Sequence, residues 1–153
     1  MLGEFQTFEQ VIDFAIDREI RSHLFYRAWA RRVSDPILRQ AFQEFSDQEF
    51  AHQKKLARVK QGQCKYLTGD MPTLGLGIAE ATEDITPHSE MSLAEVLILA
   101  MNKEKQAYHL YLQLATSAER GDLADLFLNL ANEEANHKVR LEIEYDDRFL
   151  HAE

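Results

Sequence analysis

Two Glu-x-x-His pairs are the residues of this sequence whose types and spacing can do chemistry. The first pair is Glu49 with His52, and the second is Glu134 with His137, 85 positions further on. On a helix, residues three apart lie one turn apart on the same face, so each pair can hold one metal ion. A further glutamate precedes each pair by 30 residues. Carboxylates and imidazoles in this number are typical of a metal centre.

The two pairs and the two upstream glutamates all occur among apolar residues at helical spacing, which predicts that they face a core. We call them the six-residue cluster, and its members are Glu19, Glu49, His52, Glu104, Glu134 and His137. Glu133 is rotated by about 100° from its neighbour on a helix and is expected to be solvated. His23 is expected to be a half-buried histidine rather than a ligand.

The chain also repeats itself. Residues 8–56, shifted by 85 positions without a gap, give ten identities, and these include glutamate, histidine and tyrosine as well as leucine and alanine. We interpret this as a duplicated helical hairpin. The repeated Tyr26 and Tyr111 lie two turns beyond Glu19 and Glu104, and we expect their hydroxyls to lie at the His137 end and the His52 end of the cluster, respectively. They are either core tyrosines or hydrogen-bond partners of ligand carboxylates.

The spacing within each hairpin predicts that the cluster converges at one level. Residues equidistant from the turn of an antiparallel hairpin lie side by side, and this places Glu19 beside Glu49 and Glu104 beside Glu134. Four buried carboxylates without counter-charge would cost several kcal/mol per ion. Two divalent cations would balance them, and the oxygen-rich donor set favours iron or manganese over tetrahedral zinc. Without metal, we expect raised pKa values for all four carboxyls.

Four helices must position these residues. The apolar spacing predicts helices over about 5–33, 36–61, 93–119 and from the turn at 120–122 to about 150. Asp35 with Pro36, and Ser92 with Glu95, are typical helix starts. Most glycines and prolines fall in the connection at about 62–91. This connection is long enough to run back along the second helix, so the second and third helices are expected to be parallel. The predicted fold is an all-α four-helix bundle with a long crossover.

The composition limits the classes of protein. With 153 residues, 45% of them apolar, and a net charge of −9, we expect a single domain over 1–153 and no nucleic-acid partner. No apolar run is long enough for a membrane helix and no signal segment is visible, so we expect a cytoplasmic protein. Cys64 is the one cysteine, which excludes an intramolecular disulfide, and we interpret it as an incidental thiol.

The pattern resembles the ferritin-like superfamily, closest to its rubrerythrin branch. A Glu from each of two helices and a Glu-x-x-His pair from each of the other two is the di-iron pattern of ferritin-like bundles. The resemblance implies two Fe ions per chain, with Mn or Zn possible, bridged by Glu49 and Glu134. It implies terminal ligands at Glu19 and Glu104 and one histidine per metal.

The sequence departs from full-length rubrerythrins at two points. Ala107 stands where they carry an additional glutamate, and the four-cysteine rubredoxin-like iron site is missing. Peroxidase activity is therefore not transferred directly from the resemblance. Any reductant is expected to come from an external electron donor.

The sequence-based hypothesis is a non-haem di-iron protein that oxidises Fe(II) with O2 or peroxide, in iron handling or oxidative-stress defence. Two alternatives stay open, an iron-storage or delivery protein and a dimanganese catalase-like enzyme. A metal-free structural bundle is disfavoured by the buried charge. A homo-oligomer, a dimer or larger, is expected.

Overall fold

Four long α-helices make up most of the described chain, which in this computed structural model comprises residues 5–73 and 91–150. They are α1 (Phe8–Arg32), α2 (Pro36–Gly62), α4 (Leu93–Ser117) and α5 (Gly121–Tyr145). A 3-10 turn, η1 (Cys64–Tyr66), follows α2, and a π-helical turn, η2 (Asp146–Leu150), follows α5. The predicted all-α bundle is confirmed.

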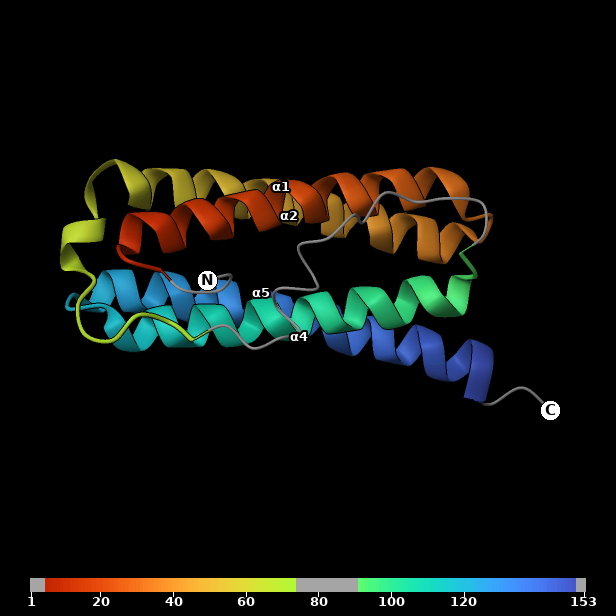
Figure 1. The fold of residues 1–153 in the computed structure, drawn as a ribbon. Coiled ribbons are helices and arrows are strands. Elements are labelled where there is room, and N and C mark those ends of the chain that lie inside the picture. The colour runs from red at the N-terminus through yellow and green to blue at the C-terminus, as the bar shows by residue number, and fades with distance from the viewer. Residues whose placement is uncertain (1–4, 74–90, 151–153) are drawn as a thin grey trace.

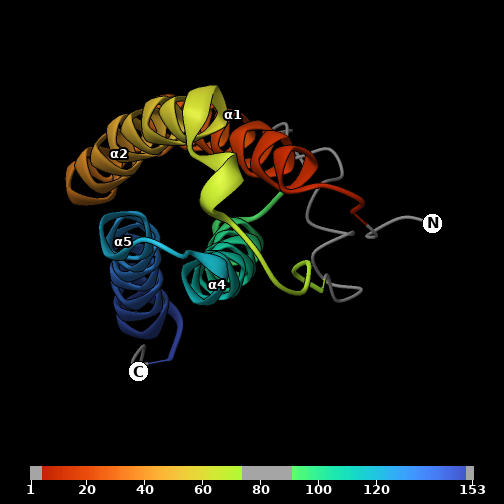
Figure 2. The same ribbon diagram turned by 90° about the vertical axis from the view of Figure 1, so that its left-hand side faces the viewer.

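The helices form two antiparallel hairpins, α1 with α2 and α4 with α5 (Figures 1 and 2). Leu67, just after η1, makes a β-bridge with Ala118, just after α4. The carboxyl ends of α2 and α4 therefore meet at one end of the bundle, so these two helices run in the same direction (Figure 1). This is the predicted crossover topology, although residues 74–90 of the connection lie outside the described ranges.

Side-chain caps begin the helices. Asp35 accepts hydrogen bonds from the amides of Ile37 and Leu38, with proline in the first turn of α2. Ser92 and Glu95 form a reciprocal capping box at α4. Thr7 caps α1, and this cap explains why the helix begins at Phe8 rather than at the expected position 5.

The carboxyl ends of the two C-terminal helices also differ from the sequence prediction. The last helix was predicted to reach about 150, but the α-helix ends at Tyr145 and its last turn widens to π geometry. The third was predicted to reach about 119, but α4 ends at Ser117. The bridge at Ala118 explains this, because it holds that residue in extended conformation.

The core consists of two apolar layers at opposite ends of the bundle. One contains Ile12, Leu56, Leu114 and Phe127, and the other contains Phe25, Phe42, Leu97 and Leu141. On every helix the cluster residues fall between the residues of these two layers, so the polar level is sealed from both ends. Each large apolar side chain buried in this way stabilises the fold by about 1.5–3 kcal/mol.

No helix in the described ranges has both the length and the apolar character required to span a bilayer.

Candidate metal centre

The six-residue cluster is brought together at the middle of the bundle. All its side chains are buried, with at most 2% of the residue surface exposed. They form two overlapping groups, within each of which the potential ligand atoms lie no more than 4.8 Å apart. One group is Glu19, Glu49, His52 and Glu134, and the other is Glu49, Glu104, Glu134 and His137. Glu49 and Glu134 thus belong to both.

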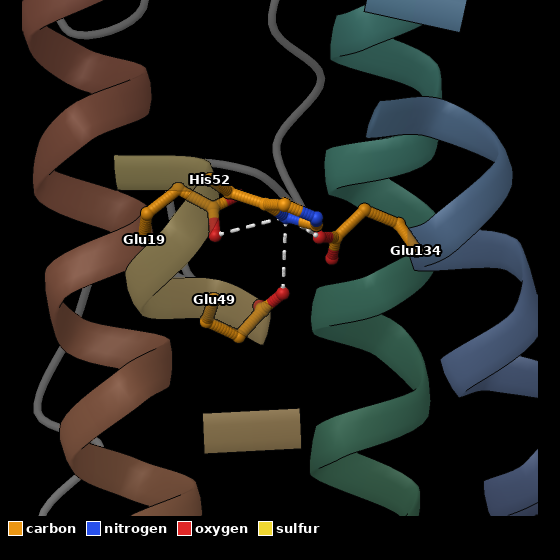
Figure 3. A group of neighbouring side chains, drawn as sticks. All are labelled: Glu19, Glu49, His52 and Glu134. Atoms are coloured by element: carbon orange, nitrogen blue, oxygen red, sulfur yellow. Dashed lines mark ion pairs between the residues drawn. The ribbon is translucent and has the colours of Figure 1, made fainter. Parts of the chain in front are cut away.

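The first group is arranged around the imidazole of His52 (Figure 3). Its Nδ1 atom lies 2.7 Å from Glu134 Oε1, 3.3 Å from Glu49 Oε1 and 3.5 Å from Glu19 Oε2. These carboxylates come from three different helices, α1, α2 and α5, and converge on the same ring nitrogen.

The second group repeats this arrangement around His137. Its Nδ1 atom lies 3.3 Å from Glu104 Oε2 and 3.6 Å from Glu49 Oε1. The two imidazole rings are nearly parallel, with an interplanar angle of 13° and centroids 6.5 Å apart. The duplicated hairpins therefore present two similar half-sites to a shared centre.

One atom of each cluster residue is buried without a hydrogen-bond partner. These atoms are Glu19 Oε2, Glu49 Oε1, His52 Nδ1, Glu104 Oε2, Glu134 Oε1 and His137 Nδ1. Leaving one buried polar atom unsatisfied costs about 1–3 kcal/mol, so six at one point are not explained by packing. They are the atoms that approach one another most closely, and carboxylate oxygens with imidazole nitrogens are a donor set for divalent cations. The residues fit a di-metal site.

Two tyrosines hold the outer oxygens of the upstream glutamates. The Tyr26 hydroxyl donates to Glu104 Oε1 at 2.6 Å, and the Tyr111 hydroxyl donates to Glu19 Oε1 at 2.5 Å. Each bond crosses from one hairpin to the other, and Tyr26 also packs edge-on against His137. The second oxygen of each carboxylate is left facing the centre. Such contacts fix the orientation of a ligand carboxylate.

The outer nitrogen of each imidazole is also held across the hairpins. His52 Nε2 pairs with Glu133, and His137 Nε2 contacts Gln48 Oε1. Glu133 is 41% exposed and so partly solvated, as expected, but its carboxylate also reaches His52, a contact that the sequence did not predict. Gln48 was missed, but the 85-residue repeat contains the signal, since it aligns Gln48 with Glu133.

Burial and mutual charge set the proton affinities of the metal-free cluster. Burial raises the pKa of Glu19 to about 7, and the charge of Glu49 acts in the same direction. Burial and then the charge of Glu104 raise the pKa of Glu134 well above its usual range.

The expectation that all four carboxyls have raised pKa values is wrong at Glu104. Burial raises its pKa, but the charge of His137 and the close contacts with Glu134 and Tyr26 outweigh burial and lower it. Burial also opposes the charged imidazoles, yet contact with Glu133 raises the pKa of His52 and the charge of Glu104 raises that of His137. The cluster without metal therefore holds protons where a cation would otherwise balance its charge.

Two buried cations beside the cluster were not anticipated from the sequence. Arg18 and Lys103, which directly precede Glu19 and Glu104, are only 6% and 5% exposed. Arg18 donates to the backbone carbonyl of Lys103 at 2.9 Å. Burial and the charge of Arg18 lower the pKa of Lys103 to about 7.

His23 and Cys64 lie apart from the cluster. His23 Nδ1 is 2.9 Å from both the hydroxyl and the carbonyl oxygen of Ser46, and the residue belongs to neither metal-binding group. Cys64 is buried in η1, and burial raises the pKa of its thiol.

Comparison with known proteins places the fold. The family model described as Rubrerythrin matches residues 95–153, which include Glu104, Glu134 and His137. A crystal structure of a protein from Thermotoga maritima, described as a ferritin-like diiron-carboxylate protein, matches with a TM-score of 0.74 and 20% identity. The match covers 93% of this chain and 96% of that one. No curated protein matches.

The fold is therefore that of the ferritin-like bundles. The predicted ferritin-like fold is confirmed, residues 95–153 are similar to the Rubrerythrin family model, and the buried carboxylate and histidine cluster fits a di-metal site.

Proposed function

We propose that this chain is a non-haem di-iron carboxylate protein that oxidises Fe(II) with O2 or peroxide, and that it serves iron handling or oxidative-stress defence in the cytoplasm. The observation behind this proposal is the convergence of six buried atoms without a hydrogen-bond partner, one from each cluster residue, on a single centre. The similarity to ferritin-like, rubrerythrin-related proteins supports iron as the metal.

The overlap of the two groups supports different roles for the glutamates. Glu49 and Glu134 belong to both groups and are proposed as the bridging ligands. Glu19 and Glu104 each belong to one group and are proposed as terminal ligands. His52 and His137 each supply one nitrogen, so the centre has four negative charges for two divalent cations.

When bound, two Fe(II) ions would supply the two electrons that reduce O2 to hydrogen peroxide, or hydrogen peroxide to two waters. The protein's own residues orient and enclose the centre. Tyr26 and Tyr111 fix the terminal glutamates, and the two apolar layers exclude water from both ends. The external electron donor and the homo-oligomer expected from the sequence are part of this proposal.

Anaerobic loading with Fe(II), followed by rapid mixing with O2 or hydrogen peroxide, tests the proposed reaction. We expect Fe(III) absorption to appear much faster than with free Fe(II), at an amplitude of two Fe per chain. Glu142→Gln is a suitable control, because this exposed glutamate of α5 pairs only with Lys138 among the described ion pairs; it should oxidise Fe(II) as the wild type does.

Two results would contradict this reaction. Tight Fe(II) binding without accelerated oxidation would favour iron storage or delivery. Evolution of O2 from hydrogen peroxide by the Mn(II)-loaded protein, with inactive iron-loaded protein, would favour a dimanganese catalase-like enzyme.

A further inference from the structure

The two imidazoles of the cluster are held by chemically different groups. His52 Nε2 pairs with the carboxylate of Glu133, whereas His137 Nε2 contacts the carboxamide oxygen of Gln48. In both rings this is the nitrogen that points away from the four glutamates of the six-residue cluster, because Nδ1 points into the centre. Both contacts fix the ring and leave Nδ1 available to a metal ion.

Gln48 and Glu133 occupy equivalent places in the duplicated hairpins. Each directly precedes a shared glutamate, and they are 85 residues apart. Each reaches the histidine of the other hairpin, just as Tyr26 and Tyr111 reach the glutamate of the other hairpin. The tyrosine contacts are chemically identical in the two halves, but the histidine contacts are not.

This difference changes the donor strength of the two ring nitrogens. A carboxylate that accepts the outer N–H of an imidazole makes the ligating nitrogen more basic than a neutral amide does. Glu133 also adds a fifth negative charge on the His52 side, with no equivalent on the His137 side. The nitrogen of His52 is further approached by three cluster carboxylates within 3.5 Å, against two within 3.6 Å at His137.

We propose that Glu133 and Gln48 are positioning residues that make the two metal positions unequal, so that the first divalent ion binds beside His52. This inference rests on the proposed di-metal function. Outer partners of ligating histidines change metal affinity by about 10–100-fold. Because Glu133 is 41% exposed, water screens its charge and the preference is expected near the lower limit, about tenfold.

Crystals of the protein loaded with a single equivalent of Co(II) test this preference. Anomalous diffraction at the cobalt edge measures the occupancy of each position separately and does not depend on activity. In the wild type, a difference of about tenfold in affinity between two independent positions gives about threefold higher occupancy beside His52 than beside His137 at one equivalent. Equal occupancies, or a preference for His137, would overturn the inference.

Exchanging the two groups separates their effect from a general structural one. E133Q gives both histidines an amide partner, and Q48E gives both a carboxylate, so each single variant should bring the occupancies close to equal. The double variant E133Q/Q48E should reverse the preference, and it retains the net charge. A preference that stays beside His52 in the double variant would contradict the proposal, and the single variants decide the matter if the double variant does not fold.

An exposed glutamate on α2, Glu44, provides the control. E44Q should keep the wild-type preference, because its side chain contacts Gln40 and not the cluster. Absence of any Co(II) at the cluster would contradict the di-metal function itself, whereas equal filling would contradict only the unequal positions.

Discussion

Replacing Glu49 and Glu134 together by glutamine is expected to abolish binding of both metal ions. These two residues belong to both groups of potential ligands, so their loss damages both positions at once. Glutamine keeps the size of the side chain but removes two of the four negative charges. We expect affinity for Mn(II) to fall by well over 100-fold, beyond the effect of losing an outer partner of a ligand.

Calorimetric titration with Mn(II) and metal analysis after dialysis measure this loss. The control is the pair of exposed replacements E44Q and E142Q, which removes the same charge from the same two helices and should leave both ions bound. A double variant at the shared glutamates that still held one ion tightly would show that one position does not need them.

The second large effect is a pH-dependent stabilisation by metal. Glu19, with its pKa raised to about 7, and Glu134, also raised, bind protons more tightly in the folded chain than in the unfolded one. The stability they contribute is complete below their unfolded pKa near 4.5 and is lost as pH rises through the raised values. The pKa values of His52 and His137 are also raised, so the stability that these two histidines contribute also decreases as the pH rises above their unfolded pKa of 6.5.

Metal binding has the opposite dependence, because its ligands must be deprotonated. The gain in stability on adding Mn(II) should therefore be larger at about pH 7.5 than at about pH 5. At about one hundred times the dissociation constant the gain at the higher pH is about 3 kcal/mol, or roughly 5–10 °C in Tm. Thermal melts with and without Mn(II) at both pH values measure it, and an equal gain at both would contradict the prediction.

Glu19 and Glu104 provide a matched contrast for the same mechanism. The two are equivalent in the repeat, but burial raises the pKa of Glu19 whereas the charge of His137 and the hydrogen bonds around Glu104 outweigh burial and lower its pKa. Without metal at about pH 7.5, Glu19→Gln should therefore stabilise the protein and Glu104→Gln should destabilise it. The reverse order in thermal melts would show that cluster charge does not control the stability of the metal-free protein.

Local patterns were sufficient to predict the helices. The caps at Asp35 and Ser92 act through neighbouring residues, and apolar spacing identifies the face that each helix buries. The six-residue cluster could be predicted from the sequence because the 85-residue repeat and the equal distances from the two turns place all six residues at the same height along the bundle. The same reasoning did not extend to residues 145–150, where no sequence feature indicated the change to π geometry.

Contacts between hairpins could not be predicted in the same way. Glu133 and Gln48 lie beside the apolar face of their own helices, and only the approach of α2 to α5 brings them to the histidines. Burial of Arg18 and Lys103 likewise depends on how α1 meets α4. Proton affinities follow from these contacts, and for this reason the lowered pKa of Glu104 could not be deduced from its sequence position.

The most direct test of the di-metal centre is a crystal structure of the Fe(II)-loaded protein, with anomalous data on both sides of the iron edge. Two iron peaks per chain should appear, about 3.5–4 Å apart and between Glu49 and Glu134. One should contact His52 Nδ1 and the other His137 Nδ1. A single peak, or iron bound only outside the six-residue cluster, would contradict a di-iron centre in this bundle.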